Sequence, residues 1–114
     1  YVTNVTSSLV EYYRAWIAGV LADNRYQPGI YAAKSNAAAL YGAAEAEYTV
    51  RGRAGAPSFW IASSTGFSIS AKPAAVGFDF AKLWQGMFDV TQTWKGAPIT
   101  IDVDVASTKS PSAP

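Results

Sequence analysis

The stretch GIYAAKSNAAALYGAAEAEY, residues 29–48, decides the fold class that the sequence predicts. It opens with a short apolar run, residues 29–33, which follows a Pro-Gly break and predicts a buried strand. Ser35 or Asn36 can then cap a helix, and the alanine-rich run that follows favours one. A strand that passes directly into a helix is typical of α/β folds.

The segment before this unit, TSSLVEYYRAWIAGVLADN (residues 6–24), predicts a first helix. Ser8 followed by Glu11 matches a capping box, and Asn24 is the expected end of the helix. The apolar residues that recur at helical spacing are Leu9, Tyr13, Trp16, Ile17, Val20 and Leu21. A helix that leads into a short buried strand again indicates an α/β architecture.

The remaining strands are predicted from three apolar runs: FWIAS (59–63), AKLWQGMFDV (81–90) and ITIDVDVAS (99–107). A long connection over 64–80 and a turn over 91–98, with Lys95-Gly96 at its tip, join them. Residues 108–114, TKSPSAP, are predicted to be a Ser/Pro-rich linker or tail after a domain that spans residues 1–107.

These strands are mostly continuous apolar runs, which need cover on both faces. The two predicted helices supply little cover, so we expect further structure on the N-terminal side. The strand at 29–33 gives a criterion. If part of the fold is missing, this strand should lie at an unpaired sheet edge, whereas a self-sufficient domain should cover it.

The composition excludes several kinds of chemistry. The chain has 114 residues, 50% apolar and 15% charged, which fits one small domain or part of a larger one. It has no cysteine and no histidine, which removes disulfides, thiol nucleophiles, the usual zinc sites and histidine bases. We expect no cofactor and no metal. The formal charge is +1 without a basic block, so a nucleic-acid partner has no electrostatic support. No run is long enough to span a membrane.

The last predicted strand alternates between apolar and polar residues. Asp102 and Asp104 fall on one face, about 7 Å apart by the rise of a strand. We interpret them as the rim of a binding site. Two alternatives stay open: solvated residues of an edge strand, or a cation site completed by backbone carbonyls. Aromatic residues make up 14% of the chain; core packing explains most of them, and a stacking surface for sugars can explain the rest.

Four motifs in this order, YQPGIYAAKS, FWIASS, KLWQG and ITIDVDVAS, resemble the C-terminal half of the glycoside hydrolase family 25 barrel, the lysozyme-type muramidases. The sequence is even more similar to the related glycoside-hydrolase-like barrels of bacterial secreted proteins. The resemblance covers about residues 8–106. It implies an α/β fold that is the C-terminal half of a TIM-like (β/α) barrel, with its last four strands and two helices. It also implies a secreted or cell-wall-associated protein.

The resemblance further implies a sugar pocket at the C-terminal ends of the strands. The family carries its catalytic D-x-E on a strand that precedes the helix beginning near Ser8, and residues 1–6 contain no acid, so we expect this chain alone to be inactive. Asp102 matches the acid of the final strand, with a supporting catalytic role. The positions expected to bind substrate are Tyr31, Trp60, Trp84, Gln85 and Asp104. For Trp60 and Trp84, a place in the core is the alternative.

Three functional hypotheses follow. The first is part of a lysozyme-like glycoside hydrolase acting on cell-wall polysaccharide, peptidoglycan, with the missing N-terminal half of the barrel as a possible partner. The second is a barrel of the same fold that binds glycan without cutting it. The third is a free-standing small α/β domain with an unrelated role.

Overall fold

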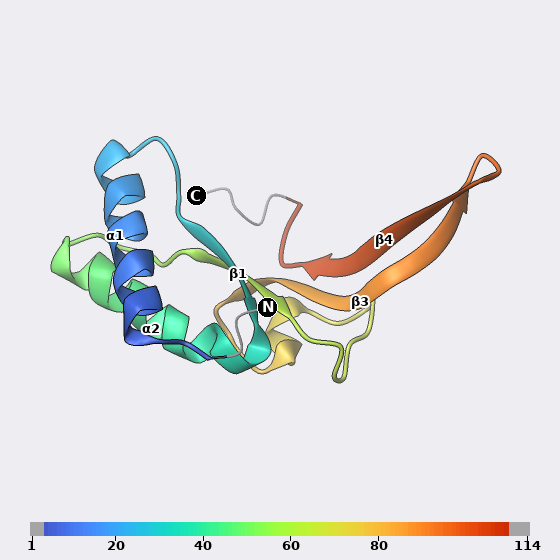
Figure 1. The fold of residues 1–114 in the computed structure, drawn as a ribbon, viewed down its shortest axis with the longest axis horizontal. Coiled ribbons are helices and arrows are strands. Elements are labelled where there is room, and N and C mark those ends of the chain that lie inside the picture. Colours follow the sequence, from blue (N-terminus) through green and yellow to red (C-terminus); the bar gives the residue numbers. More distant parts are fainter. Residues whose placement is uncertain (1–3, 110–114) are drawn as a thin grey trace.

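The computed structural model describes residues 4–109 and shows a mixed α/β fold with one four-stranded sheet and two α-helices (Figure 1). The elements in chain order are α1 (Ser7–Asp23), β1 (Gly29–Ala33), α2 (Lys34–Val50), β2 (Ser58–Ala62), the short 3-10 helix η1 (Pro73–Val76), β3 (Ala81–Trp94) and β4 (Ala97–Ala106). The predicted order of helices and strands is therefore confirmed. The tail predicted over 108–114 lies mostly outside the described residues.

Some of the residues that begin and end the helices were predicted correctly from the sequence. Thr6, not Ser8, caps α1, and its Oγ1 accepts a hydrogen bond from the backbone N–H of Leu9 at 3.2 Å. Asn24 ends α1 in the left-handed conformation with φ 60°, as predicted. The predicted cap of the second helix is wrong, because α2 begins at Lys34, directly after β1, with no side-chain cap.

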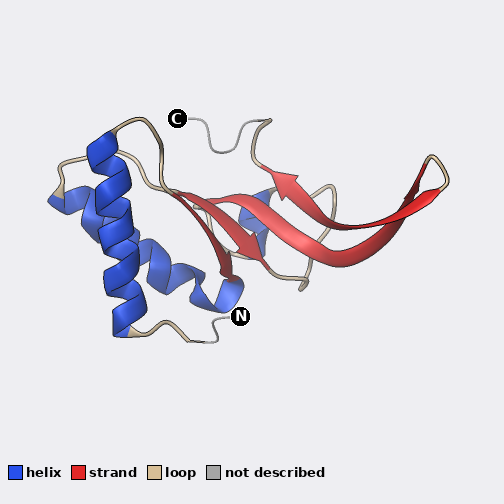
Figure 2. Cartoon of the chain, turned by 45° about the horizontal axis from the view of Figure 1, so that its top comes forward, coloured by secondary structure: helices blue, strands red, loops and turns tan. Residues whose placement is uncertain are grey.

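The sheet has the order β1-β2-β3-β4, with β1, β2 and β3 parallel and β4 antiparallel to β3. The predicted turn over 91–98 is too long, because β3 continues to Trp94 and only Lys95 and Gly96 separate the two strands. Both turn residues have positive φ, as a tight hairpin requires. The hairpin extends beyond the rest of the molecule (Figures 1 and 2). Its antiparallel pairing differs from the all-parallel strands of a regular (β/α) barrel.

The core lies on one face of the sheet. The α2 helix packs against β1 and β2, and α1 packs on α2. Phe59, Ile61 and Trp84 point to this side and are fully buried. Phe67, from the connection between β2 and η1, lies against Gly86, where an added Cβ would overlap the Phe67 ring. The long connection predicted between the second and third strands therefore completes the core.

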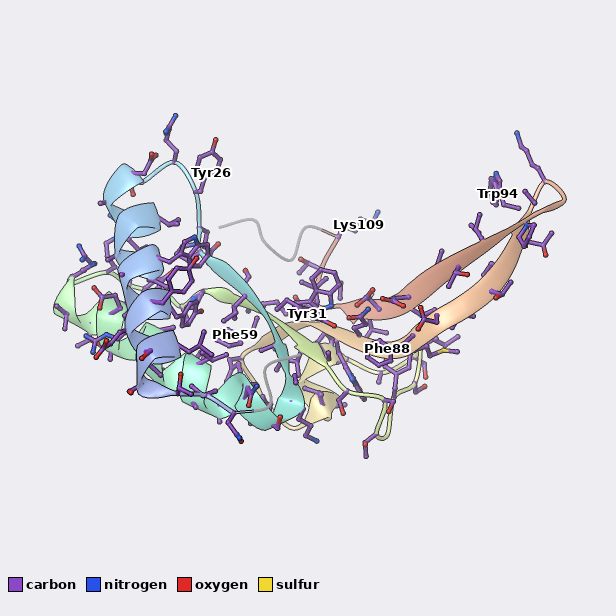
Figure 3. The ribbon with its side chains drawn as sticks, viewed as in Figure 1. Tyr26, Tyr31, Phe59, Phe88, Trp94 and Lys109 are labelled. Atoms are coloured by element: carbon purple, nitrogen blue, oxygen red, sulfur yellow. The ribbon has the colours of Figure 1, made fainter. Side chains whose placement is uncertain are left out.

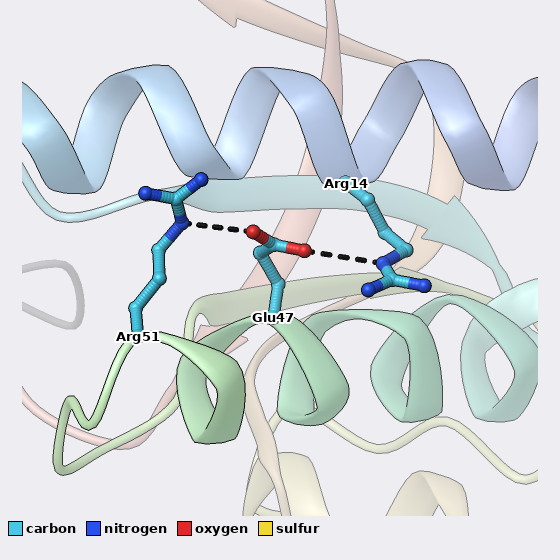
Figure 4. Close-up of polar contacts among 3 residues, drawn as sticks. All are labelled: Arg14, Glu47 and Arg51. Carbon is cyan, nitrogen blue, oxygen red and sulfur yellow. Dashed lines mark hydrogen bonds and ion pairs between the residues drawn. The ribbon is translucent and has the colours of Figure 1, made fainter.

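An ion-pair bridge joins the two helices. The carboxylate of Glu47 on α2 contacts Nε of Arg14 on α1 at 3.1 Å and Nε of Arg51 at 2.8 Å (Figure 4). Burial acts to raise the pKa of Glu47. The hydrogen bonds and charges of Arg51 and Arg14 outweigh that effect and lower this pKa below its usual value.

The sheet is open at β1. Within the described residues, β1 lies at the edge and its ladder is with β2 alone. An apolar hollow of about 280 Å³ lies beside this edge, between Leu9 of α1 and Leu40 of α2. Within the described residues, the strand at 29–33 is therefore an unpaired edge, and β4 forms the other edge of the sheet.

Candidate functional site

The face of the sheet opposite the core carries an aromatic pair. Tyr31 and Trp60 are register partners on β1 and β2, and their ring centroids lie 5.1 Å apart in an edge-to-face arrangement. Because side chains alternate along a strand, Trp60 lies on the opposite side from its buried neighbours Phe59 and Ile61. Tyr31 is 45% exposed and Trp60 is 36% exposed, so both rings reach solvent. This pair is a ready surface for a ring-shaped ligand.

Asp104 on β4 lies beside Trp60. The indole Nε1 of Trp60 donates a hydrogen bond to Asp104 Oδ1 at 2.7 Å. Burial raises the pKa of Asp104; the hydrogen bond from Trp60 opposes this rise, and the nearby charge of Asp102 adds to it. Asp104 is therefore a carboxylate whose charged form is partly disfavoured in the fold.

Asp102 is held by two donors at the base of the hairpin. Its Oδ2 accepts a hydrogen bond from the side-chain amide of Gln85, and its Oδ1 accepts one from the backbone N–H of Asp89 at 2.9 Å. The register of β3 against β4 shifts between Gln85 and Met87 and again between Met87 and Val90. Asp89 lies in this irregular segment with φ 53°, and its N–H is thereby directed at Asp102.

Gln85 lies between the two carboxylates. It is the register partner of Asp104 and donates its amide N–H to Asp102. It is only 4% exposed, and its carbonyl oxygen has no hydrogen-bond partner within the described structure. A buried acceptor without a donor is uncommon and costs stability.

These side chains lie near the C-terminal edge of the parallel strands. Ala33 and Ala62 are the last residues of β1 and β2, and Gln85 pairs with Ala62. In α/β sheets, ligands bind outside the carboxyl ends of the strands. We use the name open-face cluster for the five side chains gathered here: Tyr31, Trp60, Gln85, Asp102 and Asp104.

Trp84, the other residue predicted to bind substrate, lies elsewhere. It is fully buried on the core face, its ring packs edge-to-face on Phe67 at 5.1 Å, and its Nε1 donates to the backbone carbonyl of Ser63 at 2.7 Å. A ligand on the opposite face cannot touch it. The structure thus places Trp84 in the core, which was the alternative given for this residue.

Trp94 also lies apart from the cluster. It is 68% exposed at the end of the hairpin, far from Tyr31 (Figure 3). Asp89, whose backbone N–H binds Asp102, was not predicted from the sequence. A backbone donor in a bulge leaves no residue-type signal, so only the structure could reveal it.

A second hollow, of about 510 Å³, lies between the loops that precede β1 and β2. It is lined by Arg25, Tyr26 and Arg53 among others. Arg25 pairs with Asp23, and Arg53 donates to the side chain of Asn24. Arg25 thus connects the loop before β1 to the end of α1, and Arg53 connects the loop before β2 to the same region. Both arginines therefore have a structural role at the N-terminal ends of the strands.

The described residues hold no group of three or more His, Cys, Asp or Glu side chains placed to bind a metal ion. Neither α-helix in residues 4–109 has the length and apolar character needed to cross a bilayer. The chain matches no family model, and no curated protein or solved structure matches it.

Proposed function

We propose that this chain is part of a glycoside-hydrolase-like barrel that holds a cell-wall polysaccharide, with peptidoglycan as the expected ligand, on its open-face cluster. The observation that carries the proposal is the Trp60–Asp104 hydrogen bond beside the Tyr31 ring. Sugars have apolar ring faces that stack on aromatic side chains and hydroxyl groups that bind carboxylates and amides. The cluster offers both kinds of contact on one surface.

The incomplete sheet supports the barrel part of the proposal. The edge at β1 is open within the described residues. The apolar hollow beside it could accommodate side chains from another part of the protein. A preceding half of the barrel is the partner that would cover it. We expect a secreted or cell-wall-associated protein on the sequence resemblance alone.

Hydrolysis is the second candidate function. Glycosidases place two carboxyl groups on opposite sides of the scissile bond. Asp102, fixed by Gln85 and the Asp89 N–H, is suited to position a water or to stabilise positive charge, with the acid supplied from outside this chain. Binding without cleavage needs no further residue, so it is the function that this chain supports best by itself.

Co-sedimentation with purified peptidoglycan tests the proposal. The unmodified chain is expected to pellet with the polymer. Trp60→Ala is expected to weaken binding by up to about tenfold, since an aromatic contact contributes about 0.5–1.5 kcal/mol. Trp94→Ala is the matched control, because Trp94 is an exposed tryptophan outside the cluster. Equal binding by both variants, or none by the unmodified chain, would contradict the proposal. Assay of released reducing ends in the same samples separates hydrolysis from binding.

A further inference from the structure

The open-face cluster contains two carboxylates, and no ion pair between residues 4 and 109 involves either of them. The ion pairs found within residues 4–109 are Arg14–Glu47, Arg51–Glu47 and Arg25–Asp23. Asp102 and Asp104 are bound only by neutral donors: an indole N–H, a side-chain amide and a backbone N–H. The negative charge of the pair is therefore uncompensated in the described structure.

The cluster also has more acceptors than donors. The side-chain carbonyl of Gln85 is buried and lacks a donor, although it belongs to the same amide group that binds Asp102. The indole N–H of Trp60 and the amide N–H of Gln85 itself are already used by the carboxylates. A ligand that brings N–H donors would supply what these acceptors lack.

The aromatic pair favours the same kind of ligand. The faces of Trp and Tyr rings carry partial negative charge and attract ammonium groups within about 6 Å. Trp60 contacts Asp104 through its ring nitrogen and Tyr31 through its ring. A cation placed beside this indole would meet a ring and a carboxylate together.

We propose that the open-face cluster prefers a glycan that carries a protonated amino group, such as a glucosamine polymer, over its neutral N-acetylated form. The proposal rests on the proposed glycan-binding function and specifies its substrate class. The ammonium group would lie against the exposed side of the Asp102 and Asp104 carboxylates, with the sugar ring on Trp60 and Tyr31.

A divalent metal is the competing cation, and the cluster suits it poorly. Ca²⁺ takes six to eight oxygen ligands, whereas the cluster offers two carboxylates, and three of their four oxygens already accept a hydrogen bond. An ammonium group needs only about three acceptors and gains from aromatic rings.

Titration calorimetry of the full chain with a glucosamine tetramer and with an N-acetylglucosamine tetramer tests the proposal, at a mildly acidic pH where the amine is protonated. The amino form is expected to bind about tenfold more tightly and to weaken as salt is added. Asp104→Asn is expected to lose most of this preference. Asp79→Asn is the control, since Asp79 is an exposed acid outside the cluster.

The outcomes separate this inference from the function on which it rests. If the N-acetylated tetramer binds as well or better, the preference for a cation is wrong and glycan binding stands. If neither tetramer nor peptidoglycan binds, the proposed function fails. Tight binding of Ca²⁺ alone that blocks the tetramer would replace the ammonium site with a metal site. The salt dependence is measured on the unmodified chain, so it decides the question even where a variant does not fold.

Discussion

Trp60 and Asp104 lie 44 residues apart in the sequence, and the indole Nε1 of Trp60 donates a hydrogen bond to Asp104 Oδ1 at 2.7 Å. The bond reaches from β2 to β4 across β3, which lies between them in the sheet. It therefore fixes an aromatic ring and a carboxylate relative to each other on the open face. Stability and ligand binding are expected to depend on this contact in different ways.

Trp60→Phe keeps a ring at this position and removes the N–H donor. Since the Trp60 hydrogen bond lowers the pKa of Asp104 against the effects of burial and of Asp102, its loss is expected to raise that pKa further. An NMR titration that follows the Asp104 carboxyl carbon measures the change. Trp94→Phe, at the hairpin, should leave the titration as it is. A fall in the Asp104 pKa in Trp60→Phe would contradict the assigned hydrogen bond.

Asp104→Asn is expected to increase the stability of the chain at neutral pH while it weakens glycan binding. The pKa of Asp104 is raised in the fold. Its contribution to the stability of the fold is therefore favourable below its unfolded pKa and is lost as the pH rises through its folded pKa. Asparagine retains an oxygen that can accept from Trp60 and removes the repulsion with Asp102. Urea unfolding at pH 7 and at pH 3 measures the effect. The gain should be present at pH 7 and shrink at pH 3; a clear loss of stability at pH 7 would refute the prediction.

The sequence predicted the order of the elements. Of the positions expected to bind substrate, the structure brings Tyr31, Trp60, Gln85 and Asp104 together on one face and places Trp84 on the other. Trp84 and Gln85 are adjacent in β3, so their side chains lie on opposite faces of the sheet. Both were predicted to bind substrate, although a ligand on one face cannot reach both. Which of them faces the core is not encoded locally, because β3 begins as an apolar run with no clear alternation. Packing of Phe67 on Trp84 decides it.

The length of the hairpin could not be predicted from the sequence either. Residues 91–94, TQTW, resemble a turn in composition, yet they continue β3. Their cross-strand pairing with residues 97–100 is what makes them a strand, and such pairing is a tertiary property. The two register shifts near Asp89 likewise depend on the partner strand.

Glu47→Gln is expected to destabilise the chain by about 1 kcal/mol at neutral pH, since it removes the charge that holds Arg14 and Arg51 together and both arginines are partly exposed. The pKa of Glu47 is lowered in the fold, so its contribution is present above its unfolded pKa and is lost as the pH falls through the folded value. The free energies of unfolding of the natural chain and of Glu47→Gln, measured between pH 7 and pH 3, should therefore converge below pH 4.5.

Glu11→Gln is the control for that series, because Glu11 is an exposed acid of α1 that also lies beside Arg14. It is expected to change stability little. If Glu47→Gln and Glu11→Gln lower the free energy of unfolding by the same amount at all pH values, the ion-pair bridge between α1 and α2 makes no specific contribution to stability.

Gly86→Ala is expected to cost about 3 kcal/mol, because its Cβ would overlap the Phe67 ring in a packed core. Gly42→Ala is the matched control: an added Cβ meets nothing within 4 Å there, and alanine favours the α2 helix by about 0.5–1 kcal/mol. Chemical denaturation of both variants should thus give changes of opposite sign.

A double-mutant cycle tests whether the Phe67 ring is the reason that Gly86→Ala is destabilising. Phe67→Ala alone removes the packing on Trp84 and is expected to cost about 2 kcal/mol or more. Adding Gly86→Ala to Phe67→Ala should then cost much less than it does in the natural chain, since the overlapping ring is gone. Full additivity of the two changes would mean that Gly86 is needed for a reason other than the approach of Phe67.

Tyr13→Phe is expected to leave the stability unchanged or to increase it slightly. The Tyr13 hydroxyl is buried, and it has no hydrogen-bond partner within the described structure. Burial, together with the nearby Tyr48, raises its pKa, which is consistent with a site that solvates the hydroxyl poorly. Tyr41→Phe is the control, because the Tyr41 hydroxyl interacts with Glu45 and its loss should cost about 0.5–1 kcal/mol. If urea unfolding shows a larger loss for Tyr13→Phe than for Tyr41→Phe, the Tyr13 hydroxyl has a partner, and α1 packs differently from the arrangement described.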